Sequence, residues 1–172
     1  PNENYAREFL ELFTILKGPQ IGDGDYTNYN ETDIQTTAKV FSGIKMKPNR
    51  DIIDPDTGIP MGYALVSQHN SGSKTFSNAF NNQTIAGQSN EAGIKQELDD
   101  FVEMVFAQEA TAKAYVRKLY RYFVKSEWDQ EVEDDIISPL SAQLIASDYN
   151  LLEVLKTLLK SEHFYDEDDS DS

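Results

Sequence analysis

Apolar side chains recur at helical spacing along the first sixteen residues of the chain. A helix over residues 2–16 would gather five of them in one arc, which we expect to face the core: Tyr5, Phe9, Leu12, Phe13 and Leu16. A second face carries Glu3, Arg7 and Glu11 four residues apart, a spacing that suits a ladder of ion pairs. The helix should stop at Lys17-Gly18-Pro19, because glycine favours a left-handed cap and proline cannot continue a helix.

Further stretches of helical periodicity lie on both sides of a non-helical insertion. Asn30, with Asp33 three residues later, is typical of a helix start, and this second helix should end near Gly43. We expect three more helices over residues 94–107, 111–125 and 131–146, and a last one that begins at Asn150. In the helix over 94–107 the predicted inner stripe consists of Ile94, Leu98, Phe101, Val102, Val105 and Phe106. In the next helix it consists of Ala112, Tyr115, Val116, Leu119, Tyr122 and Phe123.

The insertion over residues 44–93 loses helical periodicity and contains three prolines. Alternation over 63–68, turn residues over 70–73 and a second short stretch over 74–76 predict a β-hairpin. The predicted fold class is therefore mainly α: a helical bundle of about six helices with a small β-hairpin insertion. We expect a single domain over residues 1–165, followed by an acidic tail over 166–172 that is disordered.

Charge and composition narrow the classes of partner. The formal net charge is -15, which repels phosphate backbones, and only the helix over 111–125 concentrates basic residues, so we expect no nucleic-acid partner. No apolar run reaches the ~20 residues of a membrane span. The chain has no cysteine, which removes disulfides, thiolate metal sites and a cysteine nucleophile, and no cofactor is indicated. It begins at Pro1 directly on a predicted helix, so we expect it to be a fragment of a longer protein. The missing N-terminal part of that protein is then one partner, and another protein is a possible second partner.

The first helix offers a first candidate for chemistry. Glu8 or Glu11 could act as a general acid or base if burial and Arg7 tuned its pKa. The alternative is structural: Glu3, Arg7 and Glu11 would form an ion-pair network with Arg117 and Arg121, which form a basic stripe at a spacing of four residues on a later helix. We expect the structural alternative.

A second candidate is His69 with Lys74. An imidazole and an ammonium at a hairpin edge could bind an anionic substrate, and histidine carries protons at neutral pH. A histidine beside a turn is more often only hydrogen-bonded, and that is the reading we favour here. The other histidine, His163, lies near the terminus, so a three-histidine zinc site is excluded by number.

Calcium is the third possibility, since aspartates cluster in two loops. Asp23 and Asp25 lie in the first, and Asp54 and Asp56 in the second. Neither loop fits the EF-hand pattern, which needs a glutamate at its twelfth position. We expect no metal site and assign these aspartates to turns.

Several ordered stretches together resemble a known family. They are residues 2–14 (NENYAREFLELFT), 29–34, 41–43, His69 with 72–76, 110–112 running into 117–124, and 161–165. The chain resembles, over nearly its whole length, a large bacterial family catalogued as domain of unknown function 1800, in the style of members from the Bacteroidetes. Family members are usually longer and many carry export signals, so the resemblance implies a C-terminal part and a periplasmic or cell-surface location. The family often has His-Asp where this chain has His69-Asn70.

Two functions compete on these observations. The first is a non-catalytic binding or assembly module of an exported bacterial protein, with a surface formed by the insertion and the first helix. The alternative is an uncharacterised hydrolase-like enzyme that uses a carboxylate of the first helix with His69 and Lys74. The enzyme requires these three groups to converge in one concave pocket, and the module does not.

Overall fold

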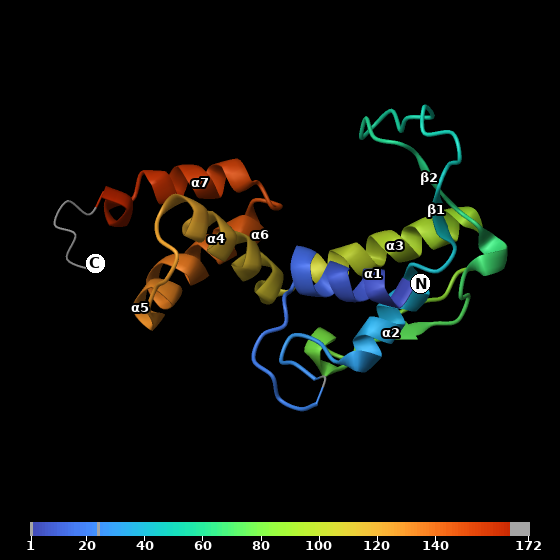
Figure 1. Cartoon of the computed structure of the whole chain (residues 1–172), viewed down its shortest axis with the longest axis horizontal. Coiled ribbons are helices and arrows are strands. Elements are labelled where there is room, and N and C mark those ends of the chain that lie inside the picture. Colours follow the sequence, from blue (N-terminus) through green and yellow to red (C-terminus); the bar gives the residue numbers. More distant parts are fainter. Residues whose placement is uncertain (1, 24, 166–172) are drawn as a thin grey trace. The chain divides into compact units, whose positions relative to one another are not determined.

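The structure is a computed structural model that describes residues 2–23 and 25–165. Its contacts divide the chain into two compact units, Pro1–Val105 (unit 1) and Phe106–Ser172 (unit 2), so the single predicted domain consists of two units, each described by itself. The chain is mainly helical with short β-hairpins in the insertion, which confirms the predicted fold class (Figure 1). The acidic tail predicted over 166–172 lies outside the described residues.

The first helix begins as predicted but changes its winding. α1 (Asn2–Glu8) runs into a π-helical turn, Phe9–Phe13. A π turn holds more residues than an α turn, so the side chains that follow move around the axis. The buried positions are Ala6, Leu10, Thr14 and Ile15. The predicted inner face is therefore wrong for Tyr5, Leu12 and Phe13, which are each more than half exposed, whereas Phe9 packs against Phe41 and Phe101 as predicted.

The second helix, α2 (Glu31–Val40), starts as the sequence predicts. The Asn30 side chain accepts the Asp33 N–H (3.0 Å), and Asp33 Oδ2 accepts the Asn30 N–H (2.9 Å). This capping box satisfies N–H groups that the first turn of a helix leaves without partners. Asp33 is fully buried and also receives the N–H and hydroxyl of Ser77, both at 2.7 Å, so it ties α2 to the insertion.

The insertion contains two hairpins, and neither has the predicted pairing. β1 (Ile44–Met46) pairs antiparallel with β2 (Gly62–Ala64), and β3 (Lys74–Thr75) pairs antiparallel with β4 (Thr84–Ile85). The predicted partner strand over 63–68 ends early, because Val66–Gln68 forms a 3-10 turn that breaks the alternation. Between β1 and β2 the chain makes a long arm over residues 47–61, which projects from unit 1 (Figure 1).

α3 (Glu91–Phe106) completes unit 1. Its buried residues are Ile94, Glu97, Phe101, Met104 and Val105. Phe101 lies within 5.7 Å, between ring centroids, of three other rings: Phe9, Phe41 and Phe76. Aromatic contacts thus join α1, the end of α2, the insertion and α3 in one core.

Unit 2 is helical. Its helices are α4 (Glu109–Phe123), α5 (Gln130–Val132), α6 (Ser138–Ala146) and α7 (Leu151–Leu159), and a π-helical turn, Glu133–Ile137, joins α5 to α6. Pro139 lies in the first turn of α6, after the wide turn, where its missing N–H is tolerated. The core consists of Ala112, Val116, Tyr120, Val132, Ile137, Leu140, Leu144, Val154 and Leu158. Tyr122 was predicted to face inward, but it is 81% exposed.

Candidate functional site

His69 and Lys74 meet inside unit 1, and the carboxylate that joins them is Glu97. Lys74 Nζ lies 2.5 Å from Glu97 Oε1 and 3.3 Å from His69 Nε2, and His69 Nε2 lies 3.3 Å from Glu97 Oε2. The three side chains are at most 1% exposed. We call these three residues the buried triad. The structure brings His69 and Lys74 together, but the carboxylate beside them is Glu97 of α3 and not one of the first helix.

The proton positions in the triad follow from its neighbours. His69 Nδ1 lies 2.7 Å from the Ser42 carbonyl oxygen, which can only accept, so Nδ1 carries the hydrogen. Nε2, the other ring nitrogen, faces both the Lys74 ammonium and Glu97 Oε2. That ammonium also contacts the Asn70 carbonyl oxygen, so Glu97, His69 and Asn70 surround it.

The local backbone places each member of the triad. Gly43 ends α2 with a φ of +77°, and a Cβ there would lie 2.7 Å from the Leu65 carbonyl oxygen and 3.0 Å from the His69 nitrogen. Only glycine allows this close approach of the α2 end to the His69 loop. Glu97 Oε2 accepts the N–H of Gln88, which holds the segment before α3 to the same carboxylate.

The triad is closed to substrate, and it does not activate a serine. Ser42 Oγ is 3.5 Å from His69 Nδ1, but its hydrogen goes to the Lys39 carbonyl at 2.5 Å. The His69 N–H is committed to the Ser42 carbonyl, so the ring offers Ser42 no base. The arrangement holds the α2 end, the insertion and α3 together through charged groups out of contact with solvent.

The carboxylates of the first helix lie elsewhere in unit 1. Arg7 bonds Glu31 of α2 through Nη2, 2.9 Å from each carboxylate oxygen, and lies 3.6 Å from Glu11. Glu11 also lies 3.2 Å from the Lys17 ammonium and accepts the Tyr29 hydroxyl at 2.6 Å. Burial alone would raise the pKa of the Glu11 carboxyl, but these hydrogen bonds and charges outweigh it and lower the pKa. Glu3 and Glu8 are exposed to solvent, and neither belongs to the buried triad.

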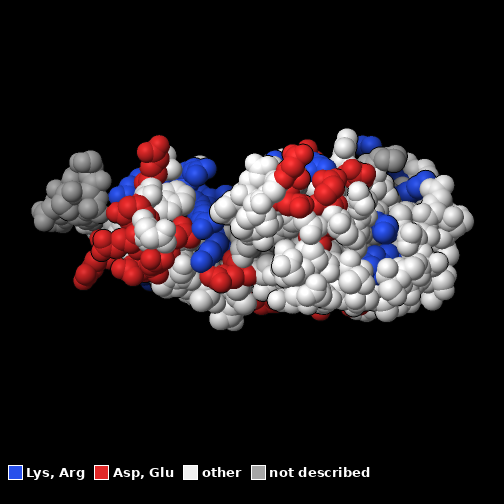
Figure 2. Space-filling view, turned by 90° about the horizontal axis from the view of Figure 1, so that it is seen from below, with Lys and Arg blue, Asp and Glu red and all other residues white. Residues whose placement is uncertain are grey.

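The basic stripe of α4 finds its partners within unit 2. Arg117 bonds Glu133 at 2.5 and 3.1 Å, and Trp128 donates its indole N–H to the same carboxylate at 3.1 Å. Arg121 lies over the Trp128 ring, 5.6 Å from its centroid. The predicted network is corrected on this point: Arg7 and Glu11 pair inside unit 1, and Arg117 pairs with Glu133. On the face in Figure 2, lysines and arginines of unit 2 are flanked by acidic residues.

The candidate calcium loops contain turns. Asp54 Oδ1 accepts the N–H groups of Asp56 and Thr57 at 2.9 and 3.1 Å, which lowers the pKa of the Asp54 carboxyl and is the predicted turn geometry. In the first loop, the Asp25 carbonyl accepts the Ile21 N–H, and Asp23 is exposed. Among residues 2–23 and 25–165, no group of three histidine or acidic side chains could hold a metal ion. Within the same residues, no helix combines the length and apolarity needed to cross a bilayer.

Unit 1 also carries an open groove. The sequence analysis predicted a surface formed by the insertion and the first helix, but not a groove. It has a volume of about 1090 Å³ and lies between α1, α3 and the base of the β1–β2 arm. Its apolar lining includes Tyr5, Phe9, Phe41, Ile44, Met46, Ile59, Pro60, Leu98 and Val102, with Asp99 and Glu103 of α3 among its polar residues. We call it the unit 1 groove. A hollow of about 550 Å³ shares Ile44, Gly62 and Leu98 with it and continues between β2 and the start of α3.

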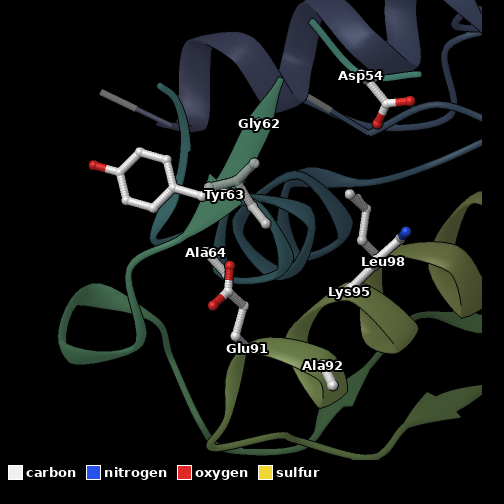
Figure 3. Close-up of a pocket in the computed structure, with 9 residues that line it drawn as sticks. Asp54, Gly62, Tyr63, Ala64, Glu91, Ala92, Lys95 and Leu98 are labelled. Carbon is white, nitrogen blue, oxygen red and sulfur yellow. The ribbon is translucent and has the colours of Figure 1, made fainter. Parts of the chain in front are cut away.

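Figure 3 shows this second hollow. Tyr63 and Ala64 of β2 lie across from Glu91 and Lys95 of α3, and Asp54 of the arm lies near the α3 side. The hollow is thus bordered by both signs of charge, whereas the unit 1 groove is mainly apolar. None of the triad residues lines either of them.

Comparison with known proteins identifies a family. A family model described as Protein of unknown function (DUF1800) matches residues 1–171. Neither a curated protein nor a solved structure matches the chain. Because the match spans nearly the whole chain, this protein belongs to the DUF1800 family, as the ordered stretches of its sequence had indicated.

Proposed function

We propose that the chain is a non-catalytic binding module, and that the unit 1 groove receives an apolar segment of another protein. The observation that carries the proposal is the groove itself, which is formed by the first helix, the arm of the insertion and α3. Several of its apolar side chains remain exposed: Tyr5 by 57%, Met46 by 55% and Ile59 by 60%. Contiguous exposed apolar surface on a folded protein usually marks an interaction site.

Charge indicates which segment would fit. The chain has a net charge of -15, and the α3 side of the groove presents the exposed carboxylates of Asp99 and Glu103. An occupant should therefore place apolar side chains on the groove floor and lysine or arginine beside α3. Such a partner suits the periplasmic or cell-surface location that the family resemblance suggests, and we propose that location too.

The buried triad supports a binding role over a hydrolytic one. A hydrolase needs its acid, base and nucleophile within reach of substrate. Here His69 and Lys74 are enclosed with Glu97, and Glu8 and Glu11 of the first helix are not part of the cluster. In this proposal the triad braces the elements that form the groove.

A displayed library of random peptides tests the chemistry of the occupant. The immobilised chain should select peptides that combine two or more large apolar residues with flanking lysine or arginine. Binding of the selected peptides should weaken as salt rises, because the carboxylates at the rim are exposed. Selection of no peptide, or of acidic peptides only, would contradict the proposal.

A further inference from the structure

The buried triad combines a nucleophile, a carboxyl group and a base in a closed space. The Lys74 nitrogen lies 2.5 Å from Glu97 Oε1, and His69 Nε2 lies 3.3 Å both from that nitrogen and from the second carboxylate oxygen. The contact between Lys74 Nζ and Glu97 Oε1 lacks the alignment of a hydrogen bond, although both atoms are buried. We propose that Lys74 Nζ and Glu97 Cδ condense to an intramolecular amide, with His69 as the proton carrier.

The reaction balances without any further reagent. A proton passes from the Lys74 ammonium to the Glu97 carboxylate, which gives a neutral amine and a carboxylic acid. The amine nitrogen attacks Cδ and forms the N–C bond, while the C=O electron pair moves to oxygen. His69 Nε2 takes a proton from the attacking nitrogen and delivers it to the hydroxyl of Glu97, which leaves as water when the C–O bond breaks. The products are one amide and one water, and His69 returns to its neutral form.

The surroundings favour this condensation. Holding an amine against a carboxyl group replaces a bimolecular encounter with an intramolecular one, for which effective molarities reach about 10⁵ M or more. An ion pair in a dry interior keeps a desolvation cost that a neutral amide does not have. All three side chains are at most 1% exposed, so little water is present to reverse the bond. The cross-link would join β3 to α3.

The Nδ1 bond of His69 gives the ring its role. Because Nδ1 donates to the Ser42 carbonyl, proton exchange with the two reacting groups takes place at Nε2, the nitrogen that faces them. The same hydrogen bond holds the ring in place during the transfer. The Gly43 turn that brings the Ser42 carbonyl to His69 is thus part of the same arrangement.

Mass spectrometry of the purified and denatured chain tests the proposal directly. The expected mass is lower than that calculated from the sequence by one water molecule. A tryptic digest should contain a branched product that joins residues 51–95, uncleaved after Lys74, to residues 96–113. A wild-type chain that keeps its calculated mass after several days in the folded state would overturn the proposal.

Two variants separate the chemistry from folding. Lys74→Arg keeps a cation beside Glu97 but has no amine, so it should show its calculated mass and no branched peptide. His69→Gln should accumulate the cross-link at least tenfold more slowly than the wild type when both chains are folded under the same conditions, as judged by circular dichroism. A branched peptide from Lys74→Arg would overturn the assignment of the bond, and an unchanged rate for His69→Gln would overturn the role of His69.

Discussion

Lys74 Nζ lies 2.5 Å from Glu97 Oε1, and neither side chain is exposed to solvent. The two residues belong to β3 and α3, so one contact joins the insertion to the helix that forms a wall of the unit 1 groove. A buried charge pair of this kind is costly to break from one side, because the remaining charge loses its oppositely charged partner in a place where water does not reach it. The stability of unit 1 therefore depends on both partners being present.

Removing the ammonium should destabilise the protein strongly. We expect Lys74→Met to lower the free energy of unfolding by about 3–5 kcal/mol, since Glu97 would remain buried without the Lys74 cation beside Oε1. Lys156→Met is the matched control, because Lys156 pairs with Glu153 on the surface and should matter by less than about 1 kcal/mol. Urea denaturation followed by circular dichroism measures both. Equal effects of the two substitutions would refute this account of the pair.

Gly43 should tolerate a methyl group far less well than Gly58. Both have positive φ values, +77° and +68°, so an alanine is strained at either site by about 1–2 kcal/mol. At Gly43 the new Cβ would also lie 2.7 Å from the Leu65 carbonyl oxygen, whereas nothing lies within 4 Å of it at Gly58. Thermal melting should therefore show a larger loss for Gly43→Ala than for Gly58→Ala. Similar melting temperatures would show that the close approach at Gly43 is not required.

The Tyr29 hydroxyl should contribute to stability in a pH-dependent way. The pKa of Glu11 is lowered in the fold, so its contribution is present above the unfolded pKa of about 4.3 and is lost as the pH falls through the folded value. Tyr29→Phe removes a hydrogen bond to this carboxylate and should cost about 1.5–3 kcal/mol at neutral pH. Unfolding curves should converge for the two proteins in acid. A difference that is the same at acid and neutral pH would argue against the Glu11 contact.

Trp128 should report the ionisation of Glu133. It is the single tryptophan of the chain, and its indole N–H donates to Glu133 at 3.1 Å. Burial would raise the pKa of Glu133, but the hydrogen bonds from Arg117 and Trp128 outweigh it and lower the pKa. The fluorescence of Trp128 should change on acidification with a midpoint below the ordinary glutamate value, and Arg117→Met should move the midpoint upward. A midpoint that does not respond to Arg117→Met would show that the fluorescence change does not report the ionisation of Glu133.

Sequence periodicity predicted the positions of the helices better than their faces. The cap at Asn30 depends on local chemistry, which can be read from the sequence directly. The buried face of the first helix depends on a π turn at Phe9–Phe13, and no residue in that turn predicts it. The predicted hairpin was wrong for a similar reason, because strand pairing is set by tertiary contacts. Alternation over 63–68 could not show that Val66 starts a turn.

Glu97, the member of the buried triad that the sequence analysis did not select, could have been found from the sequence. Glu97 lies three residues after Ile94 and four before Phe101, which places a carboxylate on the buried stripe of α3. A charged residue at such a position needs a buried partner, and Lys74 with His69 were already candidates. The groove could not be predicted, because its shape depends on how α1, α3 and the arm pack.

Binding at the unit 1 groove is the central claim, and calorimetric titration with a selected peptide tests it most directly. The double variant Met46→Ser, Ile59→Ser removes two exposed apolar side chains of the groove, and Leu152→Ser removes one of similar exposure, 57%, from α7. We expect the double variant to weaken the Kd at least tenfold, or about 1.4 kcal/mol, and Leu152→Ser to leave it unchanged. A double variant that binds as tightly as the wild type would contradict the claim.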